Sequence, residues 1–141
     1  MSGSIPSSLG NLIHASSIEL NDNKLTGSIP VSLSRLDNLY ELALRNNELT
    51  GSIPAAFADS NKHTNLSVSY NHLSQVGNPN FFNSKFYIDI DHNWFTLDGL
   101  EFVASHLPLV QYSPQSKIDI HQHADYLAVY AGGTLSNNTY Q

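Results

Sequence analysis

Residues 42–54 read LALRNNELTGSIP, and residues 18–30 read IELNDNKLTGSIP, a nearly identical phrase 24 positions earlier. The same step is kept by two further sets of residues: Gly3, Gly27 and Gly51, and Asn23, Asn47 and Asn71. A fixed period in this range is the signature of a solenoid, in which each repeat buries its apolar residues against its neighbours. The sequence therefore predicts a repeat protein.

One repeat shows how each coil is built. Leu42 and Leu44 alternate with polar or small neighbours, which predicts a short half-buried strand. Asn47 follows as a buried turn residue, and we expect its side-chain amide to bond backbone groups of its own coil and of the adjacent one. Gly51 allows a tight backbone, and Pro54 begins an irregular or 3₁₀ return to the next coil.

The later coils keep the pattern but change its spacing. Ile88 follows Leu66 after 22 residues, and Val110 follows Ile88 at the same distance, so we expect a last strand at Val110. Apolar residues at helical spacing predict a short helix near residues 97–107. Residues 118–141 alternate apolar and polar positions around a Gly-Gly turn, which is typical of the first strands of a β-sandwich. The predicted ladder of buried asparagines comprises Asn23, Asn47, Asn71 and Asn93.

Composition excludes several classes of function. With a formal net charge of −6, the 141-residue chain lacks the basic face that nucleic acid requires. No apolar run is long enough for membrane insertion of this segment, and the absence of cysteine excludes disulfide bonds. No nucleophile elbow, phosphate loop, kinase signature or metalloprotease helix occurs. We therefore predict no enzyme activity and no cofactor.

The pattern L-x-x-L-x-L-x-x-N-x-L-T-G-S-I-P resembles the leucine-rich repeat, and within it the plant-type subclass marked by L-x-G-x-I-P. The matching positions are Leu39, Leu42, Leu44, Asn47, Leu49, Gly51, Ile53 and Pro54. The resemblance implies an α/β-type solenoid, a right-handed coil with a parallel concave β-sheet and an irregular or 3₁₀ convex side. We expect residues 1–117 to form this solenoid in about four to five coils, and residues 118–141 to be a linker and the start of a truncated Ig-like domain.

The resemblance also implies a recognition module of an extracellular or cell-surface protein. The cysteine pairs that flank plant receptor ectodomains are absent, and the tail YLAVYAGGTLSNNTYQ is similar to segments that follow such repeats in bacterial surface proteins. We therefore expect a fragment of a bacterial surface or secreted protein. Met1 leads directly into the back half of a repeat, so we expect the N-terminal cap of the solenoid to be missing.

In this architecture the binding residues are the side chains that point outward from the concave strands, between the buried leucines. Ala43 and Ser69 are among the positions predicted to point outward. Aromatic residues and arginine are the usual anchors of an interface. The alternative is a solvated sheet face without a partner. The predicted ligand-binding residues are Glu19, Tyr40, Glu41, Arg45, Tyr70, Tyr87, Asp89 and Asp91.

Two further patterns resemble sites. Asp89 and Asp91 would lie about 6.5–7 Å apart on one strand face, a separation that inverting glycosidases use. An open solenoid coil seldom supplies a cleft, however, so calcium binding or simple solvation is favoured over catalysis, with solvation ahead. A D-x-H-x-H-x-D run would share one strand face and suits a metal ion, but its spacing matches no specific zinc signature, and a polar linker is favoured. The run consists of Asp119, His121, His123 and Asp125.

The sequence thus predicts a non-catalytic module that binds a protein or polysaccharide ligand through its concave face. Two alternatives stay open. The repeats act as a structural or adhesive spacer of a cell-surface protein, or they are an ectodomain fragment of a leucine-rich repeat receptor kinase. The three differ in what the outward residues of the concave strands do.

Overall fold

The computed structural model describes residues 1–57, 64–77, 87–95 and 110–111. Within these ranges the strands form two parallel sheets, one of four strands and one of five. The four-stranded sheet has the order β1 (Ser2–Ser4), β3 (Lys24–Gly27), β5 (Glu48–Ile53) and β7 (His72–Val76). The five-stranded sheet has the order β2 (Ser17–Glu19), β4 (Glu41–Ala43), β6 (Asn65–Ser67), β8 (Tyr87–Asp89) and β9 (Val110–Gln111).

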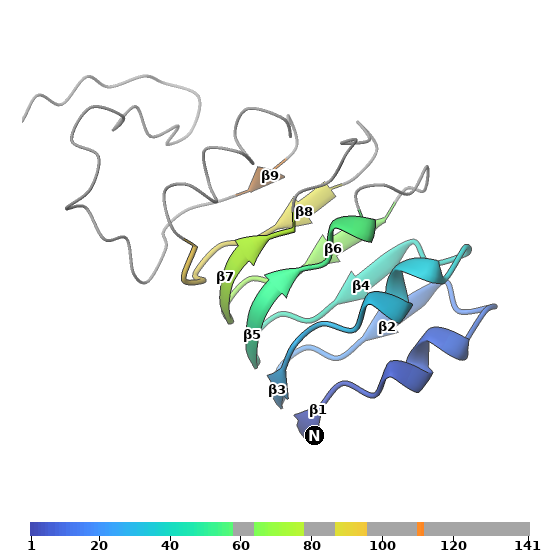
Figure 1. Ribbon diagram of the computed structural model, residues 1–141, viewed down its shortest axis with the longest axis horizontal. Coiled ribbons are helices and arrows are strands. Elements are labelled where there is room, and N and C mark those ends of the chain that lie inside the picture. The colour runs from blue at the N-terminus through green and yellow to red at the C-terminus, as the bar shows by residue number, and fades with distance from the viewer. Residues whose placement is uncertain (58–63, 78–86, 96–109, 112–141) are drawn as a thin grey trace, which may run out of the picture.

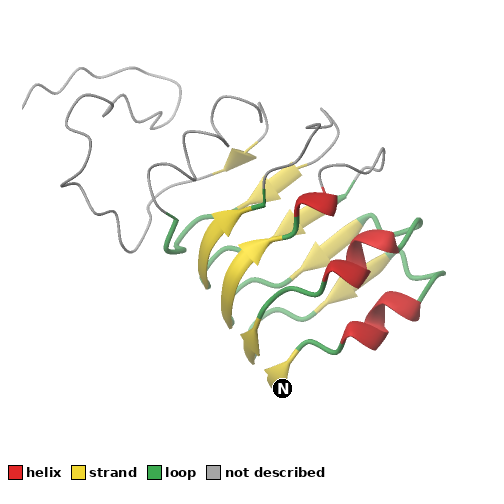
Figure 2. Cartoon of the chain, viewed as in Figure 1, coloured by secondary structure: helices red, strands yellow, loops and turns green. Residues whose placement is uncertain are grey.

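Each coil visits the two sheets in turn (Figure 1). A strand of the five-stranded sheet leads through a short turn into a strand of the four-stranded sheet, and a 3₁₀ helix then starts the return in the first coils. These helices lie in a row beside the strands (Figure 2) and are η1 (Ser7–Asn11), η2 (Val31–Arg35) and η3 (Ala55–Phe57). The stacked parallel coils and their 3₁₀ returns confirm the predicted solenoid.

The register of the five-stranded sheet reproduces the spacing of the sequence. Ile18 pairs with Leu42, Leu42 with Leu66, and Leu66 with Ile88. Ile88 then pairs with Val110, so the strand predicted there is present. The shortening from 24 to 22 residues after Leu66 therefore leaves the apolar column aligned.

The LTGSIP segments form a second sheet that the sequence pattern did not predict. We expected an irregular or 3₁₀ convex side, but Lys24–Gly27 and Glu48–Ile53 are strands, and the 3₁₀ helices begin only after Pro30 and Pro54. Gly51 has a φ of 82°, a left-handed conformation that glycine adopts without a Cβ penalty. The segment shows no clear apolar alternation, because only small or polar residues (Thr50, Gly51 and Ser52) lie between the buried Leu49 and Ile53. The sequence pattern therefore does not reveal its strand pairing.

The apolar residues pack into one continuous core. Leu42, Leu44 and Leu49 are completely buried, and the cluster to which they belong runs from Ile5 to Phe95. Burying one such side chain stabilises the folded state by about 1.5–3 kcal/mol. Since each coil contacts only its neighbours, this stabilisation is distributed along the solenoid.

Buried asparagines join the coils at the turn after each strand of the five-stranded sheet. The Asn47 Nδ2 donates to the carbonyl oxygens of Leu20 and Leu44, at 2.9 and 3.0 Å, and Asn47 Oδ1 accepts from the Leu25 N–H at 3.0 Å. One side chain thus satisfies backbone groups of its own coil and of the preceding coil. The same pattern recurs in the next two coils at Asn71 and Asn93.

Asn23 occupies the same position at the N-terminal edge of the described coils. Its Nδ2 donates to the carbonyl oxygens of Leu20 and Asn21 in its own coil, and its Oδ1 accepts from the terminal amino group of Met1. Asn23 is only partly buried, whereas Asn93 is 0% exposed. Asn23 therefore also joins two coils, through the amino group of Met1 in the preceding coil, and differs from the inner asparagines in its greater exposure.

Two sequence-based expectations fall outside the described residues: the helix near residues 97–107 and the β-rich tail at 118–141. The division into a solenoid at 1–117 and a following Ig-like segment likewise stays a prediction. No helix among the described residues is long and apolar enough to cross a membrane.

The ladder predicts a specific effect of Asn47→Ala. The substitution leaves the Leu25 N–H without its side-chain acceptor and removes one of the two donors to the Leu20 carbonyl, which Asn23 still bonds. An unsatisfied buried group costs about 1–3 kcal/mol, so we expect the free energy of unfolding to fall by about 1–3 kcal/mol in urea titrations. Hydrogen exchange at the Leu25 amide should also accelerate, although Leu25 belongs to the preceding coil.

Asn38→Ala is the matched control for this prediction. Asn38 Nδ2 also donates to a backbone carbonyl, that of Ile13 at 2.9 Å, but the bond is exposed to solvent. Its loss should change the free energy of unfolding by less than about 1 kcal/mol, because water replaces the lost partner. Unchanged exchange at Leu25 in Asn47→Ala would show that the ladder does not couple adjacent coils.

Candidate ligand-binding face

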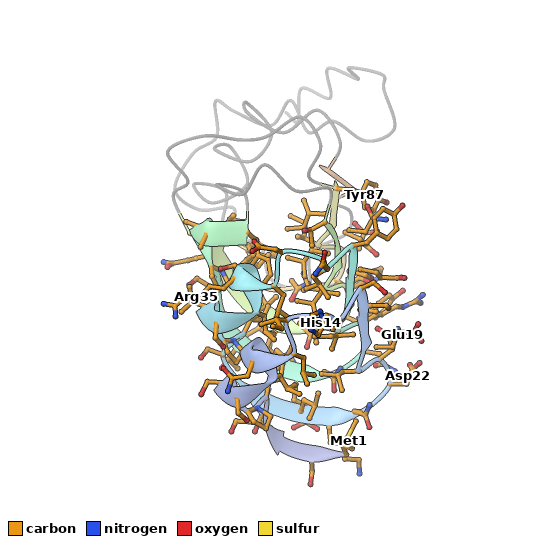
Figure 3. The ribbon with its side chains drawn as sticks, turned by 90° about the vertical axis from the view of Figure 1, so that its right-hand side faces the viewer. Met1, His14, Glu19, Asp22, Arg35 and Tyr87 are labelled. Atoms are coloured by element: carbon orange, nitrogen blue, oxygen red, sulfur yellow. The ribbon has the colours of Figure 1, made fainter. Side chains whose placement is uncertain are left out.

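The outward positions of the five-stranded sheet form two regular columns. One column is Ser17, Glu41, Asn65 and Tyr87, and the other is Glu19, Ala43, Ser67 and Asp89. Neighbouring strands lie about 4.8 Å apart, so adjacent members of a column are within contact range. We call the surface formed by these columns, and by the residues that flank their strands, the concave face. Glu19, Asp22 and Tyr87 lie on this side of the molecule and Arg35 on the opposite side (Figure 3).

The predicted binding residues come together on this face. Those within the columns are Glu19, Glu41, Tyr87 and Asp89, and those that flank the strands are Tyr40, Arg45, Tyr70 and Asp91. They come from four consecutive coils. Their role in binding a ligand stays a prediction.

The middle of the concave face carries small side chains that neighbouring residues cover. Ala43 and Ser69 were predicted to point outward into solvent, but they are only 3% and 2% exposed. Ala43 is in register with Glu19 on one side and Ser67 on the other, and its methyl group is too short to rise above them. Longer side chains therefore stand around a centre of small ones.

A third column consists of residues in the left-handed conformation at the turn before each ladder asparagine. Its members are Asp22, Asn46, Tyr70 and His92, with φ between 52° and 56°. Asn46 Nδ2 donates to Asp22 Oδ1 at 2.8 Å, which links the first two. Aspartate, asparagine and histidine adopt this conformation more readily than other residues, whereas tyrosine at this φ is an outlier. Three of the four residues at this backbone position thus suit the left-handed conformation, and the fourth, Tyr70, is strained in it.

Tyr70 belongs to a stack of side chains from three coils. Its ring lies against the His92 ring with centroids 4.0 Å apart and an interplanar angle of 9°. The Arg45 guanidinium carbon lies 5.2 Å from the Tyr70 centroid. Arg45 comes from the preceding coil and His92 from the following one, so they approach the ring from opposite sides. Because Tyr70 is still 43% exposed, its edge and hydroxyl are what it offers to a partner.

The histidine of this stack contributes contact area. Its Nδ1 atom is buried and makes no hydrogen bond with the residues that the structure describes. The flat approach to Tyr70 is therefore its main observed interaction. Offset or stacked aromatic pairs contribute about 0.5–1.5 kcal/mol beyond the burial of area.

Several residues of this region were not predicted from the sequence. Asp22 and Asn46 precede ladder asparagines by one position and keep the 24-residue step to Tyr70, which was a readable signal. His72, which begins β7 of the four-stranded sheet, forms a second stack with Trp94, with centroids 4.2 Å apart and an interplanar angle of 26°. Each follows a ladder asparagine by one position, so the same spacing argument applies to this pair.

The negative charge of the concave face affects Tyr87. Burial of its phenol and the nearby carboxylates of Asp89 and Asp91 raise the pKa of Tyr87 above its ordinary value of 10.0. The Asp91 N–H also donates to Asp89 Oδ1 at 3.3 Å, so the backbone orients that carboxylate. The preference for solvation over catalysis at Asp89 and Asp91 stays a prediction.

The D-x-H-x-H-x-D run, Asp119 to Asp125, lies outside the described residues. In the part of the chain that the structure does describe, no three His, Asp or Glu side chains gather in an arrangement that would hold a metal ion.

The strain at Tyr70 predicts that Tyr70→Asn leaves the fold intact. Asparagine fits the left-handed backbone, and relief of about 1 kcal/mol of strain offsets the lost ring contacts. We expect the free energy of unfolding to stay within about 1 kcal/mol of the wild-type value in urea titrations. Tyr70→Ala removes the same ring without relieving the backbone, so it should be less stable than Tyr70→Asn. Equal stability of the two variants would show that the backbone at this position is not strained.

The negative charge near Tyr87 predicts that Asp89→Asn changes the pKa of Tyr87 measurably. The pKa of Tyr87 should fall, because one source of negative charge is removed, yet stay above 10.0, because burial is the larger cause. Phenolate absorbance during alkaline titration, corrected with Tyr87→Phe, measures it. Since the folded state holds this proton more tightly than the unfolded state, the contribution of Tyr87 to stability is intact below pH 10.0 and declines above it. An unchanged Tyr87 titration in Asp89→Asn would contradict this account.

Comparison with known proteins agrees with this architecture. Residues 13–73 match the family model described as leucine rich repeat. No curated protein matches the chain. The leucine-rich repeat ectodomain of the receptor kinase SOBIR1 from Arabidopsis thaliana is similar, with a TM-score of 0.62 and 21% identity over 84% of this chain and 67% of that chain.

Two further solved structures are similar to the chain. The ectodomain of the receptor kinase GASSHO1/SCHENGEN3 from Arabidopsis thaliana, in complex with Casparian strip integrity factor 2, has a TM-score of 0.59 and 27% identity over 83% of this chain and 14% of that chain. A plant ice-binding protein has a TM-score of 0.53 and 22% identity over 84% of this chain and 46% of that chain. This chain thus spans less than half the length of either. Residues 13–73 are leucine-rich repeats, and the described coils form a leucine-rich repeat solenoid similar in fold to plant receptor ectodomains.

Proposed function

We propose that the chain is a non-catalytic recognition module that binds a protein ligand on its concave face. The observation that carries the proposal is the placement of three exposed tyrosines. Tyr40, Tyr70 and Tyr87 are 56%, 43% and 37% exposed, and all three lie on or beside the strands of the five-stranded sheet. Tyrosine is enriched at the energetic centres of protein interfaces.

The stack around Tyr70 supports a protein ligand over a polysaccharide. A sugar ring packs best on an open aromatic face, but Arg45 and His92 approach the two faces of the Tyr70 ring. The exposed edge and hydroxyl suit hydrogen bonds to a polypeptide. A similar solenoid, the GASSHO1/SCHENGEN3 ectodomain, was solved in complex with Casparian strip integrity factor 2.

The four-stranded sheet is a weaker candidate for binding. It exposes hydroxyl side chains, and one solenoid of similar fold is a plant ice-binding protein. An ice lattice is periodic, so an ice-binding surface needs hydroxyl groups that repeat at a constant spacing. Here Thr26 is in register with Glu48, and Thr50 with His72, which interrupts the hydroxyl rows. We therefore place the ligand on the concave face.

We further propose that the module works outside the cell, in a bacterial surface or secreted protein whose repeats belong to the L-x-G-x-I-P subclass. The similarity to receptor ectodomains supports the extracellular location, and the repeated GSIP phrase supports the subclass. The bacterial source is proposed from the absence of cysteine and from the tail YLAVYAGGTLSNNTYQ. Under the alternative of a structural or adhesive spacer, the tyrosines of the concave face have no partner. Under the alternative of a receptor kinase ectodomain, they bind a signalling ligand. Replacing these residues therefore tests the spacer alternative directly.

Replacing Tyr40, Arg45 and Tyr87 together by alanine should abolish ligand capture. The probe is a random-peptide phage library selected on the immobilised wild-type chain, and each recovered peptide is re-tested against the triple variant by biolayer interferometry. We expect most peptides to lose at least about tenfold in affinity, because anchors of this type carry most of the energy of an interface.

A matched triple variant on the other sheet controls for non-specific effects. Thr26→Ala, Glu48→Ala and Thr50→Ala change three exposed residues of the four-stranded sheet and should leave the affinities unchanged. Circular dichroism and urea unfolding verify that both variants are folded. Peptide binding that survives the concave-face changes would refute the proposal. Glycans that bind the wild type on an array and lose binding to the triple variant would identify a polysaccharide ligand instead.

A further inference from the structure

The charges of the described residues are divided unevenly between the two sides of the solenoid. The carboxylates of the concave face are Glu19, Asp22, Glu41, Asp89 and Asp91, and the single cation there is Arg45. The remaining described surface balances Asp37 and Glu48 with Lys24 and Arg35. The negative charge of the described side chains is therefore concentrated on the concave face, and the charged side chains of the remaining described surface balance.

These carboxylates surround the centre of small side chains. Glu41 stands in β4 and Asp89 in β8, two strands apart in the sheet order and two residues apart in register, because Glu41 aligns with Asn65 and Tyr87. This corresponds to about 12 Å between their backbones. Between them lie Asn65 and Ser67 of β6, and the covered Ala43 lies beside Glu41 on β4. A polypeptide that crosses this centre in extended form presents side chains on one side at steps of about 6.5–7 Å, so positions four residues apart are separated by about 13 Å. Two cationic side chains at that spacing reach both carboxylates.

Arg45, the one cation among the described residues of the face, does not cancel this field at the far strands. Arg45 is directed over the Tyr70 ring, where its guanidinium carbon lies 5.2 Å from the ring centroid. Burial is the larger cause of the raised pKa of Tyr87, and the carboxylates of Asp89 and Asp91 raise it further, which is consistent with their position beside Tyr87 in and after β8. A ligand cation placed there also meets the Tyr87 ring, and cations favour aromatic faces.

We infer that the ligand is a basic segment of another protein, with lysine or arginine side chains that pair with Glu41 and Asp89 across the centre of the concave face. The inference rests on the proposed function, since it names the chemistry of the partner at that same face. Charge complementarity of this kind sets partner choice and the rate of association. Acidic peptides are repelled by the same field.

The strained tyrosine gives this face a fixed anchor beside the carboxylates. A bulky residue in the left-handed conformation persists only where the surroundings hold it, and such outliers concentrate at binding sites. Tyr70 is held by the flat contact with His92 and by its position one residue before Asn71 in the ladder. Its hydroxyl is therefore placed for the ligand backbone before binding, which lowers the entropy cost of association.

The composition of the selected peptides tests the inference. Peptides recovered from the random phage library on the wild-type chain, and lost on the Tyr40, Arg45 and Tyr87 triple variant, are sequenced. We expect them to be enriched in lysine and arginine and depleted in aspartate and glutamate relative to the unselected library. Their binding should weaken as salt rises, because exposed charges are screened.

Two charge variants with the same change in net charge locate the effect. Glu41→Gln with Asp89→Asn should raise the dissociation constant of a recovered basic peptide by about fivefold or more. Asp37→Asn with Glu48→Gln, on the remaining surface, should leave it unchanged. Tyr70→Asn should also weaken binding while its urea unfolding stays close to that of the wild type. Equal weakening by both charge variants would reduce the effect to net charge and overturn the inference.

The outcomes separate this inference from the proposed function. If the peptides that depend on the concave face are neutral or acidic, the face binds protein ligands but the inference that the ligand is a basic segment is wrong. If no recovered peptide depends on Tyr40, Arg45 and Tyr87, the proposed function fails and the inference fails with it. If basic peptides bind equally well after Glu41→Gln with Asp89→Asn, they bind elsewhere and the inference is wrong.

Discussion

The buried asparagine side chain is the interaction on which the rest of this structure depends. Each turn between the two sheets leaves backbone carbonyl and N–H groups that no strand pairs, in a place that water does not reach. Asn47 resolves this for two coils at once, because its Nδ2 donates to Leu20 and Leu44 while its Oδ1 accepts from Leu25. A hydrogen-bonded amide at this position fixes the stagger between coils. The register of the columns on the concave face depends on this stagger.

The scaffold was largely readable from the sequence because its chemistry repeats. The step from Ile18 through Leu42 and Leu66, and the shortening at Ile88, appear unchanged as strand register. The second sheet was not readable, because LTGSIP pairs through its backbone and its side chains carry no apolar alternation. The burial of Ala43 was also not predicted. The alternation of apolar and polar residues indicates which way a side chain points, but it does not indicate whether longer neighbouring side chains cover it.

The candidate site was only partly readable for a related reason. Exposed tyrosines and carboxylates between the leucines were evident, but contacts between coils depend on which positions share one backbone conformation. The stack of Arg45, Tyr70 and His92 joins residues 25 and 22 positions apart in the sequence. Tyr70 and His92 keep the 22-residue spacing of the later coils, but Arg45 lies one position off the 24-residue repeat, so the periodic pattern gave no reason to add it to the pair.

The row of left-handed residues separates folding from recognition within a single turn. The backbone there is set by the following asparagine, so the side chain that precedes it is free to vary in chemistry at modest cost. Asp22, Asn46, Tyr70 and His92 already show four different side chains on one geometry. The residues at these four positions can therefore be substituted while the fold of the coils is kept. Grafting new side chains along this row would change what the solenoid binds while the coils beneath keep their packing.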